Sequence, residues 1–189
     1  SDIDGESTYD YAGSSVSLSD DGSIVAIGAM GNAGYVRVYQ NNSGTWTQIG
    51  SDIDGESSGD SSGSSVSLSE DGSIVAIGAY GNDANGNASG HVRVYQNVSG
   101  TWTQIGSDIN GEAANDSSGY SVALSDDGSI VAIGATGNDG NGSSSGHVRV
   151  YQNVSGTWTQ IGSDIDGEAA ADFFGGAVAL SGDGSAVAI

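Results

Sequence analysis

The sequence predicts an all-β protein made of β-propeller blades of four antiparallel strands, with three full blades and half of a fourth. The main observation is one unit of 50 or 56 residues that repeats along the chain. Its heading, Asp-Ile-Asp/Asn-Gly-Glu, starts at Asp2, Asp52, Asp108 and Asp164, and its tryptophan recurs as Trp46, Trp102 and Trp158. Periods of about 40 to 60 residues built from strands and turns are typical of radial or solenoidal folds, whose units lack a core of their own.

The second observation is that each unit reads as four strands in order, as the second copy shows. Residues 65–69 alternate apolar and polar side chains, which predicts a half-buried strand. Asp71-Gly72 follows, and glycine after aspartate supplies the positive φ of a tight hairpin. The continuous apolar run of residues 74–79 predicts a strand that is covered on both faces.

The second half of the unit completes the blade. A polar loop spans residues 80–90, residues 91–95 alternate again, a short turn covers residues 96–100, and residues 101–106 form the outer strand. Strand direction places the Asp-Gly turns on one face, and the headings and Asn/Gly-rich loops on the other. We expect a single array over residues 1–189, with blades at about 11–50, 61–106 and 117–162 and a partial blade at about 173–189.

The composition is strongly acidic: 24 aspartates and glutamates face three arginines and no lysine, for a net charge of −21. Such a surface repels nucleic acid and anionic membranes, so neither is expected as a partner. No apolar run is long enough for a membrane span. The chain starts and stops in mid-pattern, and open blades expose sheet edges. We therefore expect further blades of a longer chain, or copies of the chain itself, to complete a larger propeller or assembly.

Several dipeptides give the unit a family resemblance. Phe174-Gly175 is followed by Ala177-Val178, and Gly-Ala pairs stand at residues 28–29, 78–79 and 134–135. The unit resembles the FG-GAP repeat, the blade of integrin α-subunit propellers and of many secreted proteins. The proline of that motif is replaced by Met30, Tyr80 and Thr136, and the phenylalanine position holds Ala12, Ser62 and Ser118 in the first three copies. The resemblance implies a propeller fold and an extracellular or cell-surface location.

Calcium is the ion to consider for this family, whose blades often carry an Asp-x-Asp-x-Asp-Gly loop between the first two strands. Here that connection is too short to wrap an ion that needs about six to eight oxygens. The headings offer weaker candidates, spaced like oxygen ligands: Asp52, Asp54 and Glu56, and Asp164, Asp166 and Glu168, with Asp2, Asp4 and Glu6 in the first copy and Asn110 inside the third. The alternative, which we favour, is a turn with solvated carboxylates and no cofactor.

The arginines and tryptophans occupy fixed blade positions. Arg37, Arg93 and Arg149 are expected to pair with carboxylates of a neighbouring blade, since equivalent positions fan outward and do not converge on one ligand. The three tryptophans are expected to pack between blades, with stacking on sugar rings as the alternative. His91 and His147 stand where the first copy has Tyr35, so neither is expected to be a metal ligand or a base.

Six glycosylation sequons stand at Asn41, Asn87, Asn97, Asn115, Asn141 and Asn153, and the alternative is that asparagine and serine simply form turns here. Repetition without a catalytic pattern favours a non-enzymatic extracellular scaffold or adhesion module, as in a surface filament. The alternative is a propeller that binds glycans or cell-surface proteins through its long-loop face.

Overall fold

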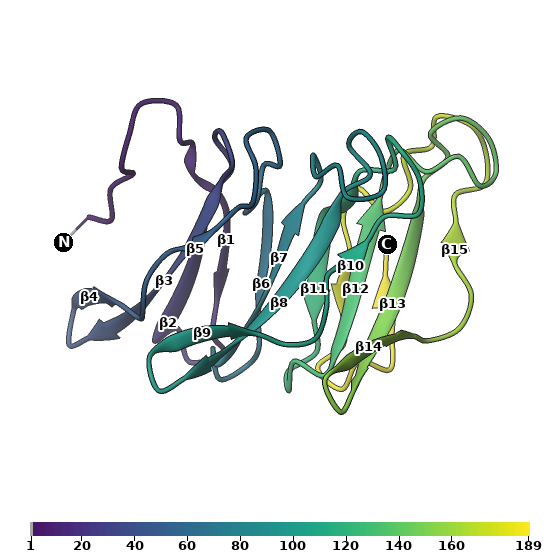
Figure 1. Ribbon diagram of the computed structural model, residues 1–189. Coiled ribbons are helices and arrows are strands. Elements are labelled where there is room, and N and C mark those ends of the chain that lie inside the picture. Colours follow the sequence, from purple (N-terminus) through teal and green to yellow (C-terminus); the bar gives the residue numbers. More distant parts are fainter. Residues whose placement is uncertain (1) are drawn as a thin grey trace.

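The computed structural model describes residues 2–189, in which every regular element is a strand. Figure 1 shows the sheets standing side by side in chain order, with long loops at one end of the strands and tight hairpins at the other. The first sheet holds β1 (Ala12–Leu18), β2 (Ile24–Ala29), β3 (Tyr35–Asn42), β4 (Thr45–Gln48) and β5 (Ile53–Asp54). The second holds β6 (Ser65–Leu68), β7 (Ile74–Ala79), β8 (His91–Val98), β9 (Thr101–Gln104) and β10 (Ile109–Asn110).

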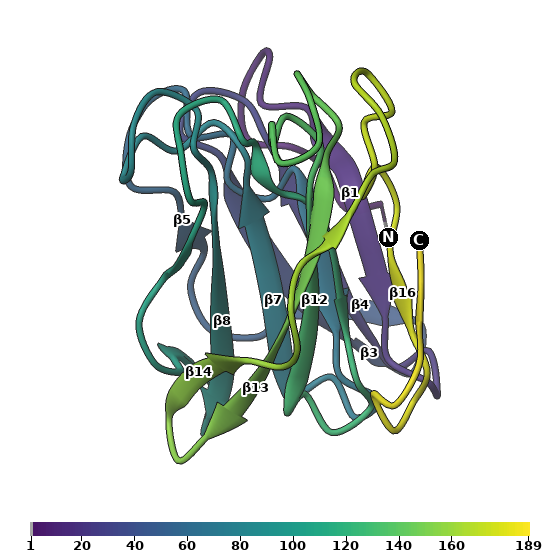
Figure 2. The ribbon, with the colours of Figure 1, turned by 90° about the vertical axis from the view of Figure 1, so that its right-hand side faces the viewer.

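The third sheet repeats the second, with β11 (Ser118–Leu124), β12 (Ile130–Ala135), β13 (His147–Val154), β14 (Thr157–Gln160) and β15 (Ile165–Asp166). A two-stranded sheet follows, formed by β16 (Ala179–Leu180) and β17 (Val187–Ala188). Viewed along the row, β1 and β16 lie on one side, and β5 and β14 lie on the other (Figure 2). The prediction of an all-β fold with four-stranded antiparallel blades is confirmed. No helix in the described chain is long and apolar enough to cross a membrane.

The outer strand of each blade differs from the prediction because it is split into two short pieces. In the second blade, β9 pairs with the far half of β8 through Tyr95 and Gln104, and β10 pairs with its first two residues through Val92 and Ile109. Gly106, at φ +73°, redirects the chain between the two pieces. The split leaves residues 105–108 free to contact the next blade.

Each first hairpin is held by one aspartate. In the third blade, the Asp127 carboxylate accepts hydrogen bonds from the Ser129 N–H (2.9 Å) and the Ser125 hydroxyl (2.7 Å), and Gly128 takes the positive φ of the turn. The Ser129 N–H and then the two serine hydroxyls hold the pKa of Asp127 below its usual value. The same turn recurs at Asp21, Asp71 and Asp183.

The hydrophobic core lies between blades. One cluster joins the first blade to the second, and another joins the second to the third; their buried members are Ala26, Val36, Val38, Ile53, Val66, Leu68, Val75, Ile77 and Tyr95, and Ala76, Val92, Val94, Ile109, Val122, Leu124, Val131, Ile133 and Tyr151. A blade therefore gains its stability by packing against its neighbours.

The blades approach to backbone contact on the inner side, at the glycine of each Gly-Ala pair. A Cβ placed on Gly78 would lie 2.1 Å from the carbonyl oxygen of Gly119 on the next blade. The hydroxyl of Ser65 donates to that same carbonyl at 2.8 Å. Equivalent bonds join Ser15 to Gly63 and Ser121 to Gly175, each at 2.7 Å. These contacts set the spacing of the blades.

Candidate site at the outer junction between blades

The outer junction is the region where the split outer strand of one blade meets the next blade. Between the second and third blades it comprises residues 105–112 and the side chains of Tyr151 and Trp158. The indole Nε1–H of Trp158 donates to the Ile105 carbonyl at 2.8 Å, and Trp102 donates to the Ile49 carbonyl at 2.9 Å one blade earlier. Both tryptophans thus pack between blades. Trp46 makes no such bond to any atom of residues 2–189.

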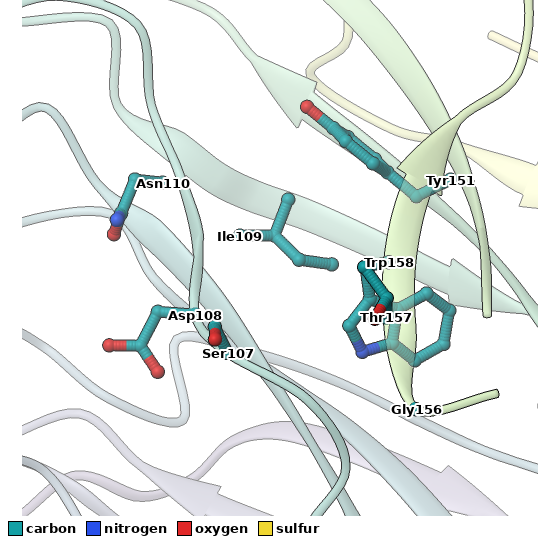
Figure 3. A pocket seen from close by; sticks show the side chains of 8 residues that line it. All are labelled: Ser107, Asp108, Ile109, Asn110, Tyr151, Gly156, Thr157 and Trp158. Atoms are coloured by element: carbon teal, nitrogen blue, oxygen red, sulfur yellow. The ribbon is translucent and has the colours of Figure 1, made fainter. Parts of the chain in front are cut away.

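A hollow of about 230 Å³ opens at this junction, lined by Ser107, Asp108, Ile109, Asn110, Tyr151, Gly156, Thr157 and Trp158. Figure 3 shows Ile109 directed toward Tyr151 and Trp158, while the polar ends of Asp108 and Asn110 point away from these rings. Ile109 is 5% exposed and belongs to the core between the blades. Ile109 therefore faces the third blade, whereas the side chains of Asp108 and Asn110 point away from it.

The arginines tie each blade to the preceding heading. Arg93 donates from Nη2 to the Asp54 carbonyl at 2.9 Å, and its Nη1 lies 3.6 Å from Glu56 Oε1. In the third blade, Arg149 donates from Nη2 to the Asn110 carbonyl at 2.9 Å, and its Nη1 lies 3.3 Å from Glu112 Oε1. The three arginines lie on β3, β8 and β13, one per blade.

The first blade uses its arginine differently. Arg37 pairs with Glu6 and also donates two hydrogen bonds of 2.9 Å to the Asp52 carboxylate. These bonds, followed by one from Gln48, hold the pKa of Asp52 below its usual value, against the opposing effect of burial. Arg37 is only 13% exposed, which makes the pair stronger than a surface ion pair.

The heading carboxylates do not gather around one point within a heading. Asp52 faces Arg37, whereas Glu56 faces Arg93 on the next blade. In the last heading, Asp164 accepts a hydrogen bond from Gln160 at 2.6 Å. Asp52, Asp54 and Glu56, and Asp164, Asp166 and Glu168, stay weak candidates for calcium, and solvated carboxylates stay the favoured interpretation.

Carboxylates do converge between successive headings, at residues that sequence reasoning had set aside. Glu56, His91 and Asp108 each offer one ligand atom within 4.8 Å of the others, and Glu112, His147 and Asp164 repeat the arrangement. Both histidines are 1% exposed. The sequence signal for this cluster was a histidine that recurs in two repeats, each time between two headings. The sequence does not show that the following heading lies beside the histidine, because this depends on the pairing of β10 with β8.

Three sequon asparagines lie near the ends of β3, β8 and β13, just before a turn, and the other three lie in loops. Asn97 accepts a hydrogen bond from the Gly100 N–H at 2.7 Å, and Asn41 and Asn153 do the same in their own turns. Asn87 donates to Asn115 at 3.4 Å, and Asn141 donates to the Gly167 carbonyl at 3.0 Å. The asparagines thus act as turn or loop formers, and glycosylation of these sites stays a prediction.

Comparison with known proteins agrees with this architecture. The family model described as FG-GAP repeat matches residues 52–95 and 110–151. The two matched segments are similar to the FG-GAP repeat. The two matched segments each run from a heading to the tyrosine of the third strand. No curated protein matches the chain.

Solved structures of similar fold include the hydrazine synthase of Kuenenia stuttgartiensis, with a TM-score of 0.59, 13% identity, and coverage of 98% of this chain and 43% of that one. A putative 6-phosphogluconolactonase from Bacteroides fragilis has a TM-score of 0.58, 14% identity, and coverage of 82% and 39%. Sqt1 of Saccharomyces cerevisiae has a TM-score of 0.53, 14% identity, and coverage of 82% and 35%. At these identities the likeness shows the fold alone, and the chain spans 35 to 43% of the length of these structures.

Proposed function

We propose that the chain is a non-enzymatic scaffold of FG-GAP blades, extracellular or at the cell surface, whose row of blades is extended by further blades of the same kind. These blades belong to a longer chain or to other copies, and the assembly serves adhesion or forms a surface filament. The observation that carries the proposal is the repeated junction, because the same residues make the same contacts between successive blades. The six sequons support a secreted location.

A ladder of backbone hydrogen bonds shows how the junction repeats. At the tight hairpins, the Asp20 N–H donates to the Glu70 carbonyl, Glu70 donates to Asp126, and Asp126 donates to Gly182, at 2.9, 2.8 and 2.8 Å. Each blade thus donates to the following blade and accepts from the preceding one. Such head-to-tail contacts can be repeated indefinitely, until a ring closes or a filament grows.

Surfaces that are buried at internal junctions are uncovered on the outermost blades. Ile53 and Ile109 are 5% exposed, but the equivalent Ile165 of the third blade is 36% exposed. At the other end of the row, Val16 of the first blade is 64% exposed, whereas the equivalent Val66 of the second blade is 9% exposed. Apolar surface of this kind favours coverage by a further blade.

Completing the fourth blade tests the proposal. Ile189 holds the repeat position of Ile133, so a copy of residues 134–162 appended after Ile189 supplies the missing outer strands. The extended chain should unfold at higher urea concentration, and the amide of Ile165 should exchange its hydrogen more slowly. A shuffled segment of equal composition is the control and should change neither. Equal urea midpoints and equal exchange for the two extensions would overturn the proposal.

A second candidate function is glycan or protein binding at the rim of the propeller. It is favoured by the hollow of Figure 3, which the rings of Tyr151 and Trp158 line together with the polar Ser107 and Thr157. Aromatic faces with a few polar groups suit sugar recognition. This candidate predicts glycan-array signals that are lost in Trp158→Ala and Trp102→Ala, and retained in Trp46→Ala. Signals that are absent from the unmodified chain would exclude glycans.

A further inference from the structure

A histidine stands between two carboxylates at the outer side of the second blade. One imidazole nitrogen of His91 and one oxygen each from Glu56 and Asp108 lie within 4.8 Å of one another. His91 Nδ1 is 3.9 Å from Asp108 Oδ2, which is too far for a hydrogen bond. In the third blade, His147 Nδ1 is likewise 3.8 Å from Asp164 Oδ2, with Glu112 beside them.

The imidazole is an unsatisfied polar group. His91 is 1% exposed, and its buried Nδ1 finds no hydrogen-bond partner among residues 2–189. A buried polar atom without a partner carries a desolvation cost, so it calls for an explanation such as a ligand. Burial, and after it the Arg93 guanidinium, lowers the pKa of His91, which keeps the ring neutral and its lone pair available.

The carboxylates are already oriented for a shared ligand. Asp108 Oδ1 accepts a hydrogen bond from Gln104 Nε2 at 2.7 Å, which leaves Oδ2 on the side of His91. Glu56 Oε1 lies 3.6 Å from Arg93 Nη1, and a carboxylate has a second oxygen to offer. Outer hydrogen-bond partners of this kind commonly orient metal-binding carboxylates.

We propose that Glu56, His91 and Asp108 bind a divalent transition-metal ion such as zinc, and that Glu112, His147 and Asp164 bind a second one. A set of one imidazole and two carboxylates suits zinc, whose ligand atoms in a tetrahedral site lie about 3.4 Å apart, so small side-chain movements close the cluster. A fourth position is left for water. Two carboxylates outweigh the single nearby arginine, so the cluster keeps a net negative charge that favours a cation.

Calcium is not the ion indicated here, because it takes oxygen ligands and has little use for an imidazole nitrogen. The first blade provides an internal comparison. Tyr35 stands at the histidine position, and its hydroxyl donates to Asp10 at 2.9 Å. The proposal therefore predicts two zinc ions per chain, and not three.

The test is zinc uptake by the full chain after treatment with a chelator, measured by equilibrium dialysis and elemental analysis. We expect two zinc ions per unmodified chain, one in His91→Tyr, one in His147→Tyr and none in the double variant. Tyrosine is the residue that the first blade already accepts at this position. Asp108→Asn keeps the shape of the side chain and should also lose one ion.

Two further readouts separate the site from general attraction to an acidic surface. Zinc should raise the melting temperature of the unmodified chain and leave that of the double variant unchanged. Cobalt(II) should give visible absorption bands that the double variant lacks. Equal zinc uptake by the double variant and the unmodified chain, or no uptake by either at millimolar zinc, would overturn the proposal. Circular dichroism of each variant verifies that it is folded.

Discussion

At Gly78 two blades approach so closely that one added methyl group should be strongly destabilising. In Gly78→Ala, the new Cβ would lie 2.1 Å from the Gly119 carbonyl oxygen and 2.2 Å from Ser65 Oγ. Real Cβ contacts essentially never fall below 3.0 Å, so the two backbones must part by about 0.9 Å. Gly78 does not have a positive φ, so backbone strain does not add to the effect.

The expected loss follows from two contributions. Forcing a methyl group into a packed interface costs about 1 to 3 kcal/mol. Separation of the blades also weakens the 2.8 Å hydrogen bond from Ser65 to Gly119, which contributes about 1 kcal/mol. We therefore expect Gly78→Ala to lower the free energy of unfolding by about 2 to 4 kcal/mol.

Urea unfolding followed by tryptophan fluorescence measures this loss. Gly176→Ala is the matched control, since its Cβ would meet the nearest atom at 3.6 Å, an ordinary contact, and we expect it to leave the urea midpoint nearly unchanged. Gly28→Ala should resemble Gly78→Ala, because its Cβ would lie 2.0 Å from the Gly63 carbonyl oxygen. If Gly78→Ala unfolds at the same urea concentration as Gly176→Ala, the blades are not held at backbone contact and the reasoning fails.

Three other predictions concern single polar contacts. Trp102→Phe removes the hydrogen bond to the Ile49 carbonyl and should lower the free energy of unfolding by about 1 kcal/mol, whereas Trp46→Phe should lower it less. Equal losses for the two variants in urea unfolding would contradict the role given to the indole N–H. Asp52→Asn breaks the paired hydrogen bonds from Arg37 and should lower the free energy of unfolding by about 1 to 3 kcal/mol. Asp54→Asn changes an exposed side chain and should leave the urea midpoint unchanged. The pKa of Asp183 is lowered from 3.8 to about 2, first by the Ser185 N–H, and that of Asp10 is lowered to about 2, first by the Ser7 N–H. A carboxylate whose pKa is lower in the folded state stabilises the fold above pH 3.8, and this stabilisation is lost as the pH falls toward 2. The urea midpoint should therefore fall between pH 3.8 and pH 2, and a constant midpoint would refute the prediction.

The strands and tight turns were predictable because local chemistry determines them. Alternation in Ser65–Leu68, the apolar run Ile74–Ala79 and the Asp-Gly turn between them each specify backbone geometry within a few residues. The blade architecture followed from the repeat. The split of the outer strand was not predictable, because it depends on Gly106 turning the chain and on which part of β8 remains unpaired.

The candidate site was harder to predict because its residues come from different repeats. Glu56 and Asp108 belong to successive headings, and they meet only because β10 pairs with the start of β8, where His91 lies. From sequence, the weak candidates for a metal site were the carboxylates within one heading. The structure instead directs Asp52 and Glu56 to arginines of different blades.

The measurement that tests the central claim most directly is the solution mass of this 18.6 kDa chain over a range of concentrations, by light scattering with negative-stain imaging of the same sample. If one repeated junction builds the fold and is extended by further blades, the uncovered faces at Val16 and Ile165 should drive association into rings or filaments. Disruption of a face, as in Val16→Asp, should then reduce the mass. A stable monomer of 18.6 kDa at every concentration, unaffected by Val16→Asp, would contradict the account.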